Sequence, residues 1–145
     1  MFKKRLLDPD FCAQRKVRFA ETDQSGFVYF ANYLRYMEET EYEFLRSLGL
    51  NVVLDDEKGK IGFPRISADL EIIEPATYRD ELTIWMKVVF NDGVQMAYQF
   101  EVASRSGRLL AAGKFEVACC RFVDGELPRA ILIPDMIIAR IPETR

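Results

Sequence analysis

The chain has 145 residues, of which 49% are hydrophobic and 30% are charged, and this balance is typical of a globular domain with a sizeable core. Its net charge of −3 and its scattered basic residues argue against a nucleic-acid-binding surface. The sequence contains no histidine, which excludes Ser-His-Asp and Cys-His catalysis and histidine-ligated zinc. Catalytic groups would have to be carboxylates, tyrosines, lysines, cysteines or backbone dipoles.

Targeting segments and bound metals are also not expected. No apolar run approaches the roughly 18 residues of a membrane-spanning helix, and the N-terminal MFKKRLLDPDF lacks the core of a signal peptide. Cys12, Cys119 and Cys120 are an odd number without framework spacing, which favours free thiols that serve as packing residues. We expect a cytoplasmic protein that forms one domain over residues 1–145 and needs no metal or cofactor.

Hydrophobic periodicity predicts the first elements. Residues 13–20 alternate apolar and basic side chains, which indicates a short, half-buried strand. Apolar residues at helical spacing predict a helix over 32–48, which Asn32 caps or whose first turn reaches back to Phe30. Residues 50–60 indicate a short helix or a loop.

From residue 66 onward the hydrophobic period changes to two, which predicts antiparallel strands. The expected strands are 66–73, 82–90, 96–104, 109–122 and a short one at 127–132, with turns at Asn91-Asp92-Gly93, Ser106-Gly107 and Asp124-Gly125. One long helix and one large antiparallel sheet make an α+β domain in which the sheet wraps the helix. Because strand 82–90 is apolar on both faces, we expect a second subunit to cover its other face.

The stretch ETDQSGFVYFANYLRYMEET, residues 21–40, joins an acidic loop to the predicted helix. Asp23 either forms a turn, with its carboxylate bound to nearby backbone amides, or is a catalytic carboxylate. Gly26 permits close backbone approach, and the helix start offers unpaired N–H groups and a positive dipole end. A carboxylate beside such amides suits attack on a carbonyl, and the helix dipole is expected to keep Asp23 ionised.

This stretch resembles the signature of the 4-hydroxybenzoyl-CoA thioesterase family, the hotdog-fold acyl-CoA thioesterases. The matching residues are Asp23, Gly26, Phe27, Val28, Tyr29, Phe30, Asn32 and Tyr33. The resemblance implies a hotdog fold, in which a curved antiparallel sheet wraps one long helix and dimerises by extending the sheet. In the family the matching Asp is nucleophile or general base, and the backbone N–H that matches Phe30 polarises the thioester oxygen. Family active sites lie at the dimer interface, which implies a homodimer or a homotetramer.

The resemblance also suggests substrate-binding residues. Tyr29, Tyr33 and Phe63 would line an acyl or aryl pocket, although aromatic residues at such spacing are also common in a core. Glu38 matches a helix position that carries a substrate-facing acid in some relatives, or it is a solvated helix charge. Together with Phe30, these residues are the expected surroundings of the acyl group.

The residues that bind the CoA nucleotide do not follow from the family pattern. Some relatives carry a basic cluster after the third strand, but the matching turn here, FNDGV, contains Asp92 and no basic residue. CoA binding would then depend on Arg105, Arg108 or Lys114, which are otherwise solvated charges at a sheet edge. We therefore expect a weaker dependence on the CoA 3′-phosphate than in relatives with a basic loop.

These features together predict an acyl-CoA thioesterase that hydrolyses the thioester of an acyl- or aryl-CoA, or of an acyl carrier protein, with Asp23. Hotdog hydratases and dehydratases generally use a catalytic histidine, which this chain lacks. The alternative is a non-catalytic acyl-binding or interaction domain with the same fold, against which the intact Asp23 and Gly26 argue. The nucleophilic and general-base routes remain open at this point.

Overall fold

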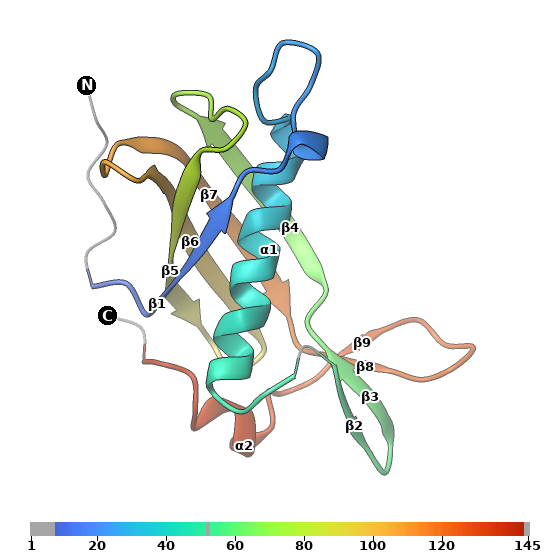
Figure 1. Cartoon of the computed structure of the whole chain (residues 1–145). Helices are drawn as coiled ribbons and strands as arrows, with labels where there is room; N and C mark the ends of the chain where they lie inside the picture. The colour runs from blue at the N-terminus through green and yellow to red at the C-terminus, as the bar shows by residue number, and fades with distance from the viewer. Residues whose placement is uncertain (1–7, 52, 144–145) are drawn as a thin grey trace.

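A computed structural model describes residues 8–51 and 53–143 of the chain. Residues 1–7, which hold much of the stretch that argues against a signal peptide, lie outside the described part. A five-stranded antiparallel sheet in the order β1-β5-β6-β7-β4 wraps one long helix, α1 (Figure 1). Within the described residues, no helix is long and apolar enough to cross a membrane.

The sheet follows from the period-two pattern. Its strands are β1 (Phe11–Lys16), β4 (Arg65–Ile72), β5 (Glu81–Asn91), β6 (Gln95–Ser104) and β7 (Leu109–Ala118). The alternate residues Leu82, Ile84, Met86 and Val88 of β5 are buried. In register, Met86 lies opposite Phe100 and Phe100 lies opposite Gly113, so one face of the sheet is continuously apolar. The other face of β5 presents half-buried Thr83, Trp85 and Lys87, which is a mixed surface and not a second apolar one.

Helix α1 (Phe30–Ser47) buries its apolar stripe against that sheet. Tyr33, Tyr36, Met37, Phe44 and Leu45 are at most 2% exposed, and Phe11 of β1 meets Phe44 with ring centroids 5.8 Å apart. The close approach of helix and sheet requires a glycine in β7. A Cβ at Gly113 would lie 2.6 Å from the Met37 sulfur and 3.0 Å from the Asp69 carbonyl oxygen.

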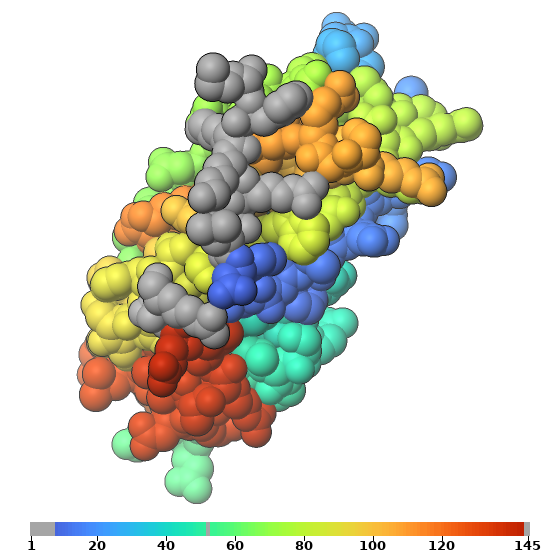
Figure 2. Space-filling model, turned by 90° about the vertical axis from the view of Figure 1, so that its left-hand side faces the viewer, coloured from blue at the N-terminus to red at the C-terminus, as the bar shows by residue number. Residues whose placement is uncertain are grey.

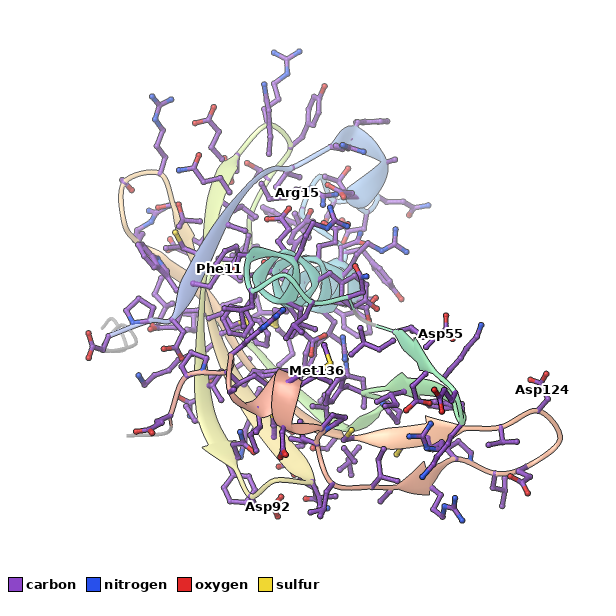
Figure 3. All side chains as sticks on the ribbon, turned by 90° about the horizontal axis from the view of Figure 1, so that it is seen from below. Phe11, Arg15, Asp55, Asp92, Asp124 and Met136 are labelled. Carbon is purple, nitrogen blue, oxygen red and sulfur yellow. The ribbon has the colours of Figure 1, made fainter. Side chains whose placement is uncertain are left out.

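A second, four-stranded sheet in the order β2-β3-β8-β9 forms an arm beside the core. Its strands are β2 (Leu54–Asp56), β3 (Gly59–Gly62), β8 (Cys120–Phe122) and β9 (Arg129–Ala130). Figure 3 shows Asp55 and Asp124 far out on its two hairpins. The expectation of a helix or loop over 50–60 is therefore wrong at its second half, where β2 and β3 form a hairpin.

Three further boundaries differ from the sequence-based expectations. The first strand ends at Lys16 and a short 3-10 helix, η1 (Phe19–Glu21), follows where the strand was expected to continue to residue 20. The expected strand 109–122 is interrupted at Cys119, which separates β7 from β8. The short helix α2 (Asp135–Ile138) follows β9 and packs Ile137 into the core.

One end of the molecule collects several connections. The end of β1, the start of α1, the β4–β5 connection and the β6–β7 turn all lie there (Figure 1). The bridge between Phe27 and Thr77 joins the loop that precedes α1 to the β4–β5 connection. The β5–β6 turn, which contains Asp92, lies at the other end of these strands.

Candidate active site

Asp23 lies in a tight, exposed turn just before α1. Its backbone N–H donates to the Phe27 carbonyl at 2.8 Å, and Gly26 N–H donates to the Asp23 carbonyl at 3.0 Å. Gly26 has a φ of +86°, which an L side chain rarely adopts, so the turn itself requires this glycine. No atom lies within 4 Å of a Cβ built there, so its role within the described residues is conformational.

Ser25 holds the Asp23 carboxylate. Its side-chain hydroxyl and its backbone N–H (2.9 Å) both donate to Oδ1 of Asp23. The hydrogen bond from the Ser25 hydroxyl is the main cause that lowers the pKa of Asp23, and the backbone N–H groups of Ser25 and Phe27 add to it. These local donors favour the ionised state that the sequence predicts for Asp23.

The first backbone N–H of α1 is free to bind a ligand. The helix begins at Phe30, and its N-cap residue Tyr29 makes no side-chain capping hydrogen bond. The Phe30 N–H donates to no acceptor among the residues that the structure describes. Asn32 does not cap the helix as expected, because its side-chain amide donates to the Glu21 carbonyl at 2.8 Å. An unpaired N–H at a helix start is a ready donor to an oxyanion.

Glu21 fixes the loop to the helix, a role that the sequence analysis did not find. The residue is 7% exposed, and its side chain accepts hydrogen bonds from the Tyr36 hydroxyl (2.9 Å) and the Arg18 backbone N–H (2.8 Å). Its other oxygen pairs with Arg15, which lies against α1 (Figure 3). Its carbonyl accepts the Tyr29 N–H at 2.9 Å. The acidic loop thus has a fixed position relative to the free N–H at the helix start.

The aromatic residues of the signature divide into an exposed group and a buried group. Tyr29 and Phe30 are 49% and 54% exposed, and their ring centroids lie 4.9 Å apart beside the Asp23 turn. Tyr33 is fully buried, and its hydroxyl accepts the Ala76 N–H at 3.0 Å. Phe63 is only 7% exposed. In the protomer, Tyr33 and Phe63 are core residues, which is one of the two alternatives that the sequence left open.

Glu38 is paired, which argues against a freely solvated helix charge. Arg65 of β4 lies 3.2 Å from Glu38 and 2.6 Å from Glu41 one helical turn further along α1. The Arg65 guanidinium also stacks over the Phe115 ring, 4.7 Å from its centroid. Glu41 is 1% exposed, and burial raises its pKa to about 7 against the opposing effect of Arg65. Glu38 and Arg65 are half-exposed and accessible from the surface of the protomer.

The three basic candidates do not form one cluster. Arg105 and Arg108 lie in or beside the β6–β7 turn, where Arg105 pairs with Glu81 and Arg108 pairs with Glu74, both at 3.2 Å. Lys114 lies within β7, 3.5 Å from Glu116. Arg105 and Arg108 are at the end of the molecule that carries Asp23, whereas Lys114 lies within the sheet, so these residues remain separate candidates for CoA binding.

The cysteines and acidic residues form no metal site in the described part of the chain, where no group of three or more such side chains could hold an ion. Cys12 is exposed, while Cys119 and Cys120 are both buried and free. Burial raises the pKa of the Cys119 thiol to about 11, which disfavours the nucleophilic thiolate. Asp23 is an exposed carboxylate in the turn that hydrogen bonds to the Glu21 carbonyl join to the start of α1.

Comparison with known proteins identifies the family of this chain. The family model of the thioesterase-like superfamily matches residues 17–141. The 4-hydroxybenzoyl-CoA thioesterase of Pseudomonas sp. (strain CBS-3) is 28% identical over 132 residues, which covers 83% of this chain and 89% of the relative. The 1,4-dihydroxy-2-naphthoyl-CoA hydrolase of Thermosynechococcus vestitus is 27% identical over 128 residues, which covers 87% and 84%.

Solved structures agree on the fold. The 1,4-dihydroxy-2-naphthoyl-CoA thioesterase from Synechocystis matches with a TM-score of 0.79 over 90% of this chain and 94% of that chain, at 22% identity. A hypothetical protein from Thermus thermophilus matches with a TM-score of 0.78 over 91% and 97%, at 29% identity. With the family match spanning most of the chain, this protein belongs to the thioesterase-like superfamily and has its hotdog fold.

Proposed function

We propose that this protein hydrolyses acyl-CoA thioesters with Asp23 as the reactive carboxylate. The reaction class, thioester hydrolysis, follows from the superfamily to which the chain belongs. The observation that supports the site is the pairing, on two segments that hydrogen bonds to Glu21 hold together, of an exposed carboxylate whose pKa is lowered with the free Phe30 N–H. This pairing supplies an attacking or proton-accepting oxygen beside a donor for the thioester oxygen.

Two routes give the same products. In the nucleophilic route an Asp23 oxygen bonds to the thioester carbon, the C–S bond breaks, and the CoA thiolate leaves and takes up a proton. Water then hydrolyses the mixed anhydride and restores the carboxylate. In the general-base route Asp23 takes a proton from water while the water oxygen attacks, and the C–S bond breaks in the same way. In both routes the Phe30 N–H stabilises the negative charge on the former carbonyl oxygen.

The exposed aromatic residues favour an aryl or otherwise bulky acyl group. Tyr29 and Phe30 form a tilted, half-exposed pair beside Asp23, and such surface is costly to leave in water without a ligand or partner. Two relatives are named for aryl-CoA substrates, 4-hydroxybenzoyl-CoA and 1,4-dihydroxy-2-naphthoyl-CoA. Glu38, accessible and held by Arg65, is proposed as a polar contact for a substituent on that acyl group.

Thiol release from a panel of thioesters tests the proposal. The panel contains 4-hydroxybenzoyl-CoA, 1,4-dihydroxy-2-naphthoyl-CoA, aliphatic acyl-CoAs of several lengths and one acyl carrier protein thioester, each followed with a thiol-reactive dye. We expect multiple turnovers with at least one CoA thioester and the highest kcat/KM for an aryl-CoA. Release of one thiol per chain or none, with all panel members, would contradict hydrolysis.

The alternative, a non-catalytic acyl-binding domain, gives a different result in the same experiment. Such a domain would bind a non-hydrolysable acyl-CoA analogue, raise its own melting temperature by mass action, and release no thiol. The exposed Asp23 carboxylate beside an unpaired N–H argues against it, because simple binding of an apolar acyl group has no use for a charge that the bound ligand would desolvate.

A further inference from the structure

A surface groove of about 610 Å³ lies next to the Asp23 loop and has no assigned role. The end of β1 and the following η1 segment form one side of the groove, and the β4–β5 connection forms the other. Its distinctive lining residues are Lys16, Arg18, Phe19, Tyr78 and Arg79. Figure 2 shows the end of β1, the β4–β5 connection and the β6–β7 turn together at the upper end of the molecule. Basic and aromatic side chains thus alternate along one hollow.

The groove is lined by four basic residues and no acidic residue among those that the structure describes, although the whole chain carries a net charge of −3. Lys16, Arg18 and Arg79 form no ion pair with any residue that the structure describes, and all of them are exposed. Arg15, on the same strand, is instead bound to Glu21 and Glu39. The unpaired cations gather on one side of the end of the molecule that carries Asp23. Such a cluster attracts polyanions, and phosphate groups above all.

The groove also carries two exposed aromatic rings. Phe19 is 73% exposed and Tyr78 is 44% exposed, and their rings meet at 77° with centroids 5.6 Å apart. The Arg79 guanidinium lies over the Tyr78 ring, 5.2 Å from its centroid. The two rings are in contact with each other, and contiguous exposed apolar surface can mark a binding site. A flat aromatic base can stack on the open ring of Phe19, as bases do on aromatic platforms.

Arg79 occupies a backbone conformation that an arginine seldom adopts. Its φ is +71°, in the left-handed region where glycine and asparagine are far more common. The conformation is fixed by the turn from Thr77 to Asp80, in which the Asp80 carboxylate accepts the Thr77 N–H at 2.8 Å. A ligand contact made by the Arg79 side chain would explain why a long cation occupies this strained backbone position.

The groove is connected directly to the candidate active site. Phe27, whose carbonyl accepts the Asp23 N–H, forms a bridge with Thr77 of the β4–β5 connection. The Val28 N–H donates to the Ala76 carbonyl at 2.9 Å in the same region. The turn that carries Asp23 and the turn that carries Tyr78 and Arg79 are therefore held side by side. A ligand with its thioester at Asp23 can extend into the groove.

We propose that this groove binds the nucleotide part of CoA, with its phosphates on Lys16, Arg18 and Arg79 and its adenine on Phe19. This inference rests on the proposed thioesterase function and names how its substrate is held. It offers a basic surface elsewhere than the FNDGV turn, whose lack of basic residues led to the expectation of a weaker dependence on the CoA 3′-phosphate than in relatives with a basic loop. An acidic carrier protein would match the charge, but it offers no base for the exposed aromatic pair, so a nucleotide fits both features.

Two variants test the groove, and both measurements use the full chain. Arg18→Gln combined with Arg79→Asn removes two cations, and asparagine suits the left-handed backbone at the second position, so folding is retained. Phe19→Ala removes the stacking surface. We expect the double variant to weaken binding of free CoA and of adenosine 3′,5′-bisphosphate, measured by calorimetry, by about tenfold. Phe19→Ala is expected to weaken both by on the order of fivefold.

Steady-state kinetics distinguish the contribution of the nucleotide to KM from that of the rest of the substrate. KM for the acyl-CoA should rise in both variants, while KM for the matching acyl-pantetheine and kcat for either should stay at the wild-type value. Lys58→Gln, which removes an exposed cation from the β2–β3 hairpin, is the matched control and should change nothing. Unchanged CoA affinity in the groove variants, or an equal rise for acyl-pantetheine, would overturn the proposal.

Failure of the groove and failure of the catalytic proposal give different results. The wild-type protein could hydrolyse no thioester and yet bind CoA with an affinity that falls in the groove variants. This result would support the nucleotide site and contradict the thioesterase function. Equal kcat/KM values of the wild-type protein for acyl-CoA and acyl-pantetheine would contradict the nucleotide site and support the thioesterase function. Groove variants that affect only an acyl carrier protein thioester would assign the groove to that carrier and overturn the nucleotide proposal.

Discussion

At Asp23 the turn-forming and the catalytic interpretations are compatible. The Ser25 hydroxyl and N–H both bind Oδ1, and they favour the ionised form of the carboxylate that either catalytic route needs. The same bonds hold the carboxylate in a fixed direction at the surface. The signature in the sequence predicted the residue, but it did not predict Ser25 as the donor or Glu21 as the anchor. Both roles depend on backbone positions that the loop adopts only when folded.

Glu41 is expected to make the stability of the fold depend on pH in the neutral range. Burial raises its pKa from 4.5 to about 7, so between these values the folded chain binds more protons than the unfolded chain. The free energy of unfolding should therefore fall as the pH rises through this range, by on the order of 2–3 kcal/mol. Melting temperatures recorded between about pH 4.5 and pH 8 measure this contribution.

Glu41→Gln should remove most of that pH dependence, because glutamine keeps the shape and takes up no proton. Glu43→Gln, the same change at an exposed position of α1, is the matched control and should retain it. A wild-type stability that rises steadily over the same range, or an unchanged profile in Glu41→Gln, would show that Arg65 holds Glu41 ionised throughout.

The helix and strands that could be predicted from the sequence are those in which the hydrophobic period is uninterrupted. The helix and the strands β4, β5 and β6 match the expectations to within a few residues, because their apolar positions repeat without a break. The β2–β3 hairpin was missed because its polar run DDEKGK shows no alternation. Its stability comes from pairing with β8, far along the chain. The sequence could not decide between a core and a pocket role for a single residue such as Tyr33, because that role depends on burial, and the fold places Tyr33 in the core.

The contact between α1 and the sheet depends on the absence of a side chain at Gly113. Gly113→Ala would place a methyl group 2.6 Å from the Met37 sulfur, so we expect the free energy of unfolding to fall by about 1–3 kcal/mol in denaturant titrations. A double-mutant cycle with Met37→Ala isolates this contact, because the added methyl should cost less once Met37 is shortened. Strictly additive effects would place the strain elsewhere, such as at the Asp69 carbonyl.

For the whole molecule, we propose a homodimer that pairs along β4. This strand is at the edge of the sheet, and its residues Ile66, Ala68 and Ile72 are exposed in the protomer. An unpaired edge with exposed apolar side chains favours pairing with a second copy. The mixed outer face of β5 makes that face a weaker candidate than the sequence suggested. The expected arrangement extends the sheet from one protomer into the next.

Light scattering measures this directly, with a mass of two or four chains as the expected result. Ile72→Lys places a charge on the proposed edge contact and should shift the protein toward the monomer and lower its activity. Lys60→Gln, on the arm and away from β4, should leave the mass unchanged. A fully active monomer in the wild-type protein would contradict both the interface and an active site that needs two chains.

If the Asp23 carboxylate performs the hydrolysis, kcat must fall in Asp23→Asn. Asparagine keeps the size of the side chain and an oxygen that accepts the Ser25 hydrogen bonds, so the melting temperature should not change. It cannot attack a carbonyl as a carboxylate or take a proton from water. We predict a loss of kcat on the order of 10²–10⁴-fold at nearly constant substrate affinity. Near-wild-type turnover in this folded variant would contradict the account and leave Asp23 as a turn residue.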